Sequence, residues 1–120
     1  MTPFTVLTRD TPAGPVLEIS GELDTATAPQ ALRAIEALAP RPGQQVVVDL
    51  AGLRFCDSSG ISALIAAHKS VHASDAGLAL TGVPRHLART LATVGLGDFF
   101  VTHATASDAH ARWAESRSDQ

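Results

Sequence analysis

Short runs of β-branched and aliphatic residues alternate along the chain with longer segments of mixed polarity. The first two runs flank residues 10–15, whose glycine and two prolines are typical of a turn, so they predict a β-hairpin. A third run contains three consecutive valines, as expected for a central strand that its neighbours cover. The predicted strands are Phe4–Arg9, Val16–Ser20, Gln45–Leu50, Leu78–Thr81 and Phe99–Thr102.

Three of the intervening segments place apolar residues at the 3.6-residue spacing of a helix. Asp24 or Thr25 can cap the first helix, which ends before Pro40, and residues 57–60 open the second. Pro84 begins the third, because proline is tolerated in a first helical turn. The apolar positions are Ala28, Ala31, Leu32, Ile35 and Leu38 in the first helix, Ile61, Leu64, Ile65, His68 and Val71 in the second, and Leu87, Leu91 and Val94 in the third.

A fourth helix, which carries the single tryptophan, is predicted near the end of the chain. Thr105, Ser107 or Asp108 can cap it, and Trp113 would pack it against the rest of the domain. The polar residues 115–120 that follow are expected to fray.

The order of these elements predicts a single α/β domain over residues 1–120, with its core at residues 4–114. We expect a mixed sheet of four to five strands, about four helices, and right-handed crossovers between parallel strands. In open sheets of this kind, the loops that leave the carboxyl ends of adjacent strands form the usual functional edge. Here those loops are Gly21–Thr25 and Phe55–Gly60.

Composition narrows the classes of function. The chain has 120 residues, 45% of them hydrophobic and 18% charged, as in a soluble globular domain with one core. Its formal net charge of -3 provides no basic field to attract nucleic acid, so direct nucleic-acid binding is not expected. No apolar run approaches the roughly 20 residues of a membrane span, and residues 1–9 do not resemble a secretory signal. We therefore expect a cytoplasmic protein without a membrane partner.

The side chains that could support catalysis or bind a metal do not form a recognisable set. Ser58 and Ser59 lack the G-x-S-x-G context of a hydrolase nucleophile, and no histidine falls in the two loops named above. His68 and His72 can share a helix face, but no third metal ligand is evident. Cys56, the single cysteine, is expected to be a small apolar filler in a reducing compartment, and the scattered glycines form no phosphate loop. We expect no enzymatic activity, no metal and no cofactor.

The segment Asp57-Ser58-Ser59-Gly60 lies between a predicted buried strand and a helix. At such a junction the N–H groups of the first turn and the positive end of the helix dipole point outward. An N-cap at Asp57 or Ser58, with a tight entry eased by Gly60, explains these residues structurally. A second role is compatible with that one, because phosphorylation of Ser58 would add roughly -1.5 to -2 charges beside the amides and beside Asp57. The fold would tolerate this charge better than a docked partner would.

These residues carry a resemblance to a known family. The segments 46–50 (VVVDL) and 55–61 (FCDSSGI), with GELD at 21–24, look like a STAS domain and resemble the bacterial anti-sigma factor antagonists in particular. The resemblance runs from about Phe4 to the last helix. It implies that the unphosphorylated protein binds an anti-sigma factor and releases the sigma factor for transcription. It also implies that this anti-sigma factor, a serine/threonine kinase, phosphorylates Ser58, with Ser59 as the second choice, and that a serine phosphatase reverses the step.

The resemblance further implies where the partner docks. The two loops would border the docking surface, and the exposed side of the helix that begins at Ser58 would extend it. The expected partner-binding residues are Asp24, Asp57, Ser58, Ser59, Gly60, Ser62 and Lys69. A monomer or weak dimer that changes partners on phosphorylation is expected. The alternative is a constitutive, non-catalytic STAS subunit of a larger assembly in stress signalling or lipid transport, which needs no hydroxyl at position 58.

Overall fold

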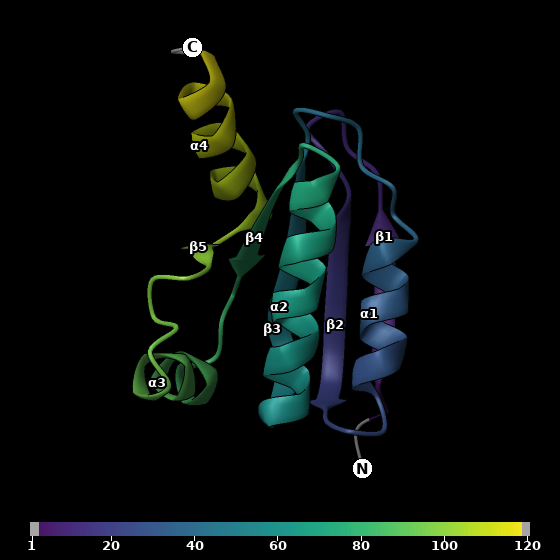
Figure 1. The fold of residues 1–120 in the computed structure, drawn as a ribbon, viewed down its shortest axis with the longest axis vertical. Coiled ribbons are helices and arrows are strands. Elements are labelled where there is room, and N and C mark those ends of the chain that lie inside the picture. The colour runs from purple at the N-terminus through teal and green to yellow at the C-terminus, as the bar shows by residue number, and fades with distance from the viewer. Residues whose placement is uncertain (1–2, 119–120) are drawn as a thin grey trace.

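The computed structural model of the chain describes residues 3–118, which form a five-stranded sheet and four helices (Figure 1). The strands are β1 (Thr5–Arg9), β2 (Val16–Leu23), β3 (Gln45–Cys56), β4 (Gly77–Thr81) and β5 (Val101–His103). The helices are α1 (Ala28–Glu36), α2 (Ser58–Ala73), α3 (Arg85–Thr93) and α4 (Ala106–Ser118). The predicted α/β class, mixed sheet and helix number are confirmed.

The strands lie side by side in chain order, β1-β2-β3-β4-β5. β1 is antiparallel to β2, and all other neighbours are parallel. β1 therefore begins at the end of the sheet where β2, β3 and β4 finish. We call this end the rim; it lies at the bottom of Figure 1, where α1 and α2 also begin.

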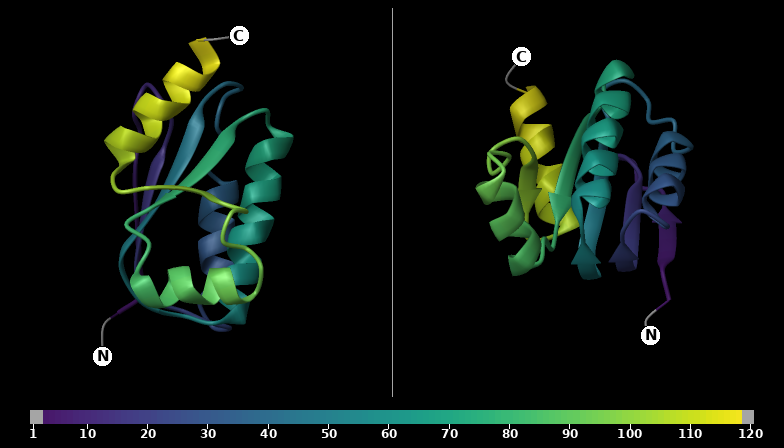
Figure 2. Two further views of the ribbon diagram at one scale, coloured as in Figure 1. Left: turned by 90° about the vertical axis from the view of Figure 1, so that its left-hand side faces the viewer. Right: turned by 60° about the horizontal axis from the view of Figure 1, so that its bottom comes forward.

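The helices divide between the two faces of the sheet. Figure 2 shows α1 and α2 on one face and α4 on the other. Successive crossovers in one direction along a sheet place their helices on the same face, which accounts for the position of α1 and α2. α3 lies at the rim end of β4 and β5 (Figure 1).

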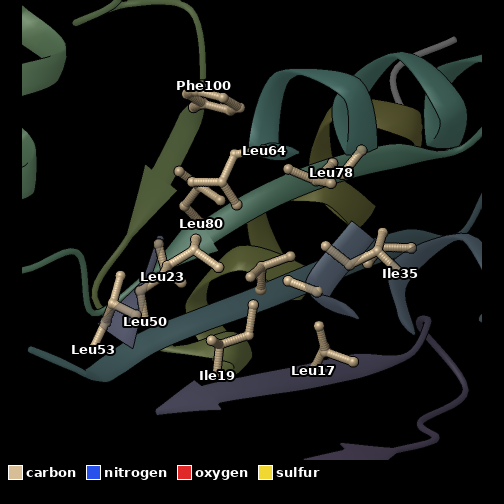
Figure 3. Packing of buried hydrophobic residues seen from close by; sticks show 14 of the residues in the cluster. Leu17, Ile19, Leu23, Ile35, Leu50, Leu53, Leu64, Leu78, Leu80 and Phe100 are labelled. Carbon is tan, nitrogen blue, oxygen red and sulfur yellow. The ribbon is translucent and has the colours of Figure 1, made fainter. Parts of the chain in front are cut away.

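The main core lies between the sheet and the α1–α2 layer and is almost entirely aliphatic (Figure 3). Its largest fully buried side chains include Leu17 and Ile19 of β2, Leu50 of β3 and Leu64 of α2. A smaller cluster on the opposite face joins Ala109 of α4 to one row of the sheet, formed by Val16, Val47 and Ala79. Burial of the first set holds α1 and α2 over one face of the sheet, and burial of the second set holds α4 on the other face.

β2 and β3 are longer than predicted. β2 continues through residues 21–23 and β3 through residues 51–56, and the two remain paired as far as Leu23 and Cys56. Glycine and charged residues in these segments weaken the strand signal in the sequence, but two register shifts between the strands allow the pairing to continue. The rim turns thus begin at Asp24 and Asp57, and not at Gly21 and Phe55 as expected.

The helix ends also differ from the predictions. α1 begins at Ala28 with Thr27 at the N-cap position, so the prediction of Asp24 or Thr25 as its N-cap is wrong. α3 ends at Thr93, which leaves Val94 56% exposed and not on an apolar helix face.

The C-terminal part follows the prediction more closely. Thr105 Oγ1 accepts a hydrogen bond from the Asp108 N–H at 3.1 Å, which selects Thr105 among the three candidate caps of α4. β5 begins at Val101, and Phe99, predicted to start that strand, lies before it and is 40% exposed. Residues 115–118, expected to fray, are helical, and the rest of that segment, residues 119–120, lies outside the described part of the chain.

Candidate functional site

The start of α2 is fixed at the rim by its N-cap. Asp57 Oδ1 accepts hydrogen bonds from the N–H groups of Ser59 at 2.9 Å and Gly60 at 3.2 Å. The Asp57 carbonyl accepts from the Ile61 N–H at 3.1 Å, and the Asp57 N–H donates to the Leu23 carbonyl at 3.1 Å. The expected cap is thus confirmed at Asp57, and most first-turn amides already have an acceptor.

Gly60 allows α2 to approach the end of β2 closely. A Cβ atom at this position would lie 2.6 Å from Cys56 Sγ and 2.9 Å from both Cγ and the carbonyl oxygen of Leu23. Such distances are shorter than van der Waals contact, so any larger residue would push the helix away from the sheet. The glycine therefore places the first turn of α2 against the neighbouring rim turn.

Asp24 organises that neighbouring turn, between β2 and α1. Its Oδ1 accepts hydrogen bonds from the N–H groups of Ala26 at 3.0 Å and Thr27 at 3.2 Å. Thr27 Oγ1 in turn donates to the Glu22 carbonyl at 2.7 Å and accepts from the Asp24 N–H at 3.0 Å. Asp24 thus stabilises a turn before the helix and leaves the neighbouring Thr25 side chain exposed.

A pair of hydroxyls joins the two rim turns. Thr25 Oγ1 and Ser59 Oγ lie 3.0 Å apart, and either can donate to the other. Ser59 is half-buried, whereas the adjacent Ser58 is exposed. Within residues 3–118 the Ser58 hydroxyl makes no hydrogen bond. The two serines thus differ: one hydroxyl holds the turns together, and the other faces solvent.

An apolar groove extends from this hydroxyl pair along the surface between α1 and α2. Its volume is about 470 Å³, and no charged side chain lines it. The lining residues are Thr25, Ala28, Pro29 and Leu32 from the α1 side and Ser59, Ser62, Ala63 and Ala66 from the α2 side. Of the residues predicted to bind a partner, Ser59 and Ser62 line the groove, whereas Lys69 is exposed one turn beyond it.

The sequence alone did not identify Thr25, Pro29 and Leu32 as part of this surface. The sequence pattern predicts Thr25 as a helix cap and Leu32 as an apolar core position of the first helix. Their role depends on the packing of α1 beside α2, which is a tertiary contact without a local sequence signal. Gly60 is an indirect indication of this surface in the sequence, because the absence of a side chain permits the close approach of the two rim turns.

Among residues 3–118, the side chains at the rim do not pair a nucleophile with a base. In the part of the chain that the structure describes, no hydrogen bond joins Ser58 or Ser59 to a histidine. Burial, followed by the charge of Asp57, raises the pKa of the Cys56 thiol to about 11, so the thiol stays protonated and poorly nucleophilic at neutral pH. No group of three or more potential metal ligands occurs among residues 3–118, and no helix there has the length and apolar character needed to cross a bilayer.

Comparison with known proteins identifies a matching family and similar chains. A family model described as Mlab, STAS domain, matches residues 6–102. The anti-sigma-B factor antagonist of Listeria monocytogenes serovar 1/2a is 31% identical over 80 residues, which cover 67% of this chain and 70% of the relative.

Solved structures show the same fold. An anti-sigma factor antagonist from Mycobacterium paratuberculosis superimposes with a TM-score of 0.80 at 27% identity, covering 93% of this chain and 95% of that one. SpoIIAA in its unphosphorylated form gives a TM-score of 0.74 at 21% identity, covering 94% and 97% of the two chains. The Bacillus cell fate determinant SpoIIAA in its phosphorylated form gives a TM-score of 0.65 at 21% identity, covering 92% of this chain and 98% of that one.

Proposed function

The chain belongs to the STAS domain family, and on that premise we propose that it is an anti-sigma factor antagonist whose docking surface is the rim and the α1–α2 groove. In the unphosphorylated state it binds an anti-sigma factor and releases the sigma factor. A phosphate on Ser58, added by that anti-sigma factor acting as a serine/threonine kinase and removed by a serine phosphatase, prevents the binding. The protein has no catalytic role of its own in this scheme.

The exposed, unbonded hydroxyl of Ser58 beside the Asp57 carboxylate is the observation that carries the proposal. A phosphate at a helix N-terminus is often stabilised by first-turn amides. Here the amides of Ser59, Gly60 and Ile61 already donate to Asp57, so a phosphate on Ser58 cannot use them without displacing the cap. The new charge therefore stays on the outer surface, next to an existing negative charge.

That position makes the phosphate costly for a complex and nearly harmless for the free protein. A partner that covers the rim must remove water from the phosphate and place its own groups against roughly -3 charges in total, those of the phosphate and of Asp57. A penalty of about 3 kcal/mol lowers the affinity on the order of a hundredfold. In the free protein the same group remains hydrated.

Ser59 is a poorer acceptor for the phosphate. Its hydroxyl is half-buried and pairs with Thr25 Oγ1, so modification would break the contact that joins the two rim turns. Ser58 requires no such rearrangement. The geometry thus supports the same order of preference that the resemblance implies.

The remaining partner-binding residues fall into two groups. The carboxylates of Asp24 and Asp57 hold the two rim turns by accepting backbone N–H groups, and Gly60 sets the distance between the turns. Ser62 adds the groove to the docking surface, and Lys69 would contact only a partner that reaches beyond the groove. A cytoplasmic monomer or weak dimer suits this scheme, because the rim must remain free for exchange of partners.

The test is phosphate transfer to the purified protein by the anti-sigma factor kinases that its source genome encodes. Site-resolved mass spectrometry should find phosphate on Ser58 in the wild type and in Ser59→Ala, and none in Ser58→Ala. Binding of the same kinase, measured by titration calorimetry, should fall on the order of a hundredfold in Ser58→Asp and stay near wild type in Ser70→Asp, a control further along α2. Phosphate on Ser59 alone, or unchanged binding by Ser58→Asp, would contradict the proposal.

A constitutive subunit of a larger assembly is the second candidate, since the STAS family also contains such members. It predicts that the isolated chain aggregates or oligomerises through an uncovered apolar patch, and that Ser58 carries no phosphate in cells. Size-exclusion chromatography of the purified chain separates the two candidates. A monomer supports the antagonist.

A further inference from the structure

A second cleft lies at the opposite end of α2 from Ser58. It is bounded by the last turns of α2, by the edge formed by β4 and β5, and by α4, and its volume is about 490 Å³. This volume is within the usual range of small-molecule sites, ~300–1,000 Å³. At a rise of 1.5 Å per residue, His72 is about 20 Å along α2 from Ser58, so the cleft is separate from the rim.

The α4 wall of the cleft places a guanidinium over an anchored indole ring. The Trp113 ring packs onto Gly77, where a Cβ atom would lie 2.5 Å from the nearest ring carbon, and its Nε1–H donates to the Gly43 carbonyl at 2.8 Å. The Arg117 guanidinium carbon lies 5.3 Å from the centroid of this ring. A cation–π contact with an anchored indole limits the positions that the guanidinium adopts.

The α2 wall carries two imidazoles. The rings of His68 and His72 are nearly parallel, with an interplanar angle of 7° and centroids 6.2 Å apart. The His68 ring also contacts Phe99, with centroids 4.8 Å apart, which fixes its orientation. Each neutral imidazole can donate one N–H to a ligand.

These groups make no hydrogen bonds or ion pairs with one another. Across the described range, residues 3–118, the guanidinium of Arg117 and both imidazoles have no hydrogen-bond or ion-pair partner within the protein. Of the described residues, Asp75 is the single carboxylate that lines the cleft. The floor is apolar and includes Leu78 and Val101, the latter 53% exposed at the edge of the sheet.

We propose that this cleft binds a small carboxylate with an apolar body. Arg117 pairs with the carboxylate through two parallel N–H donors, the geometry that a guanidinium offers to this group, and an imidazole supplies a further donor. The apolar body covers Val101, the exposed aliphatic side chain of the floor, and removes its surface from water. An anion without such a body would contact only Arg117 and the imidazoles, and an apolar molecule without a charge would contact only the floor of the cleft.

The experiment uses the full chain and three probes: hexanoate, hexanol and inorganic phosphate, at one pH and one ionic strength. Hexanoate carries both features of the ligand, hexanol only the apolar body, and phosphate only the charge. Trp113 is the single tryptophan, so its fluorescence reports directly on the cleft. Nuclear magnetic resonance shifts of the Trp113 indole N–H and the Gly77 amide provide an independent measurement.

Hexanoate should give a saturable change, and hexanol and phosphate should give none at the same concentrations. Arg117→Gln should weaken hexanoate binding about tenfold or more, because it removes the charge-assisted hydrogen bonds. Arg112→Gln, on the same helix and paired with Glu115 at the surface, should bind as the wild type does. An absent hexanoate response, an equal response to hexanol or to phosphate, or unaltered affinity of Arg117→Gln would overturn the proposal.

Discussion

Replacement of Gly60 by alanine tests how the rim is built. The added methyl group would lie 2.6 Å from Cys56 Sγ and 2.9 Å from two atoms of Leu23, one of them the carbonyl oxygen. That oxygen accepts the Asp57 N–H at 3.1 Å, and Leu23 is fully buried, so neither can move alone. The first turn of α2 must therefore shift outward, away from the end of β2.

Two opposing effects set the magnitude. An extra methyl group in a well-packed region costs about 1–3 kcal/mol, and contacts with backbone and with a buried side chain favour the upper part of this range. Alanine gains at most ~1 kcal/mol over glycine in a helix, and less in the first turn. We expect Gly60→Ala to lower the free energy of unfolding by about 1–2 kcal/mol, since the steric cost exceeds the gain in helix propensity.

Urea denaturation followed by circular dichroism measures this difference. The loss corresponds to a fall of about 0.5–1 M in the midpoint for a domain of this size, with an unchanged slope. Gly97→Ala is the matched control, because a Cβ there meets Ala92 at 3.6 Å, an ordinary contact, and its midpoint should stay near that of the wild type. If Gly60→Ala proved as stable as the wild type or more so, the close approach of the two rim turns would not constrain this position.

Three further changes have expected outcomes. Asp57→Ala should lose about 1 kcal/mol of stability in urea denaturation through loss of the N-cap, whereas Asp57→Asn should retain most of it. Burial and the neighbouring His72 lower the pKa of His68 in the folded state. The stability contributed by its neutral form is therefore complete above pH 6.5, the unfolded value, and is lost as the pH falls below that value. His68→Gln should reduce this pH dependence of the free energy of unfolding, measured from pH 7.5 to 5. Gly77→Ala should displace the Trp113 ring and shift its fluorescence to longer wavelength, and an unchanged spectrum would contradict the packing described for α4.

Local sequence signals were sufficient wherever one interaction decides the structure. The three valines of β3, the proline before α3 and the Asp57 cap each act within a few residues, and the structure contains all three. The α/β class followed from their order, because alternating strands and helices leave few arrangements that bury both. Thr105 was among three candidates that differ little in intrinsic preference, and only the folded chain selects it.

The rest of the site depends on contacts between distant segments. Strand pairing carries β2 as far as Leu23 despite the glycine at position 21, because β3 offers partners along its whole length. Asp24 was expected to cap a helix, but Thr27 takes that position, and the Asp24 carboxylate satisfies the N–H groups of the preceding turn. The link between Thr25 and Ser59 spans 34 positions and has no counterpart in local spacing.

The antiparallel direction of β1 decides how the protein should be attached to a surface. Because β1 starts at the rim, Pro3 and Phe4 lie beside Gly21 of β2, where a Cβ atom would lie 2.8 Å from the Pro3 carbonyl oxygen. α4 ends on the far side of the molecule (Figure 1). A tag or a sensor-chip linkage joined after α4 leaves the rim turned toward a partner in solution, whereas one joined before β1 would crowd it. Immobilisation after α4 is therefore the orientation in which partner binding should be measured.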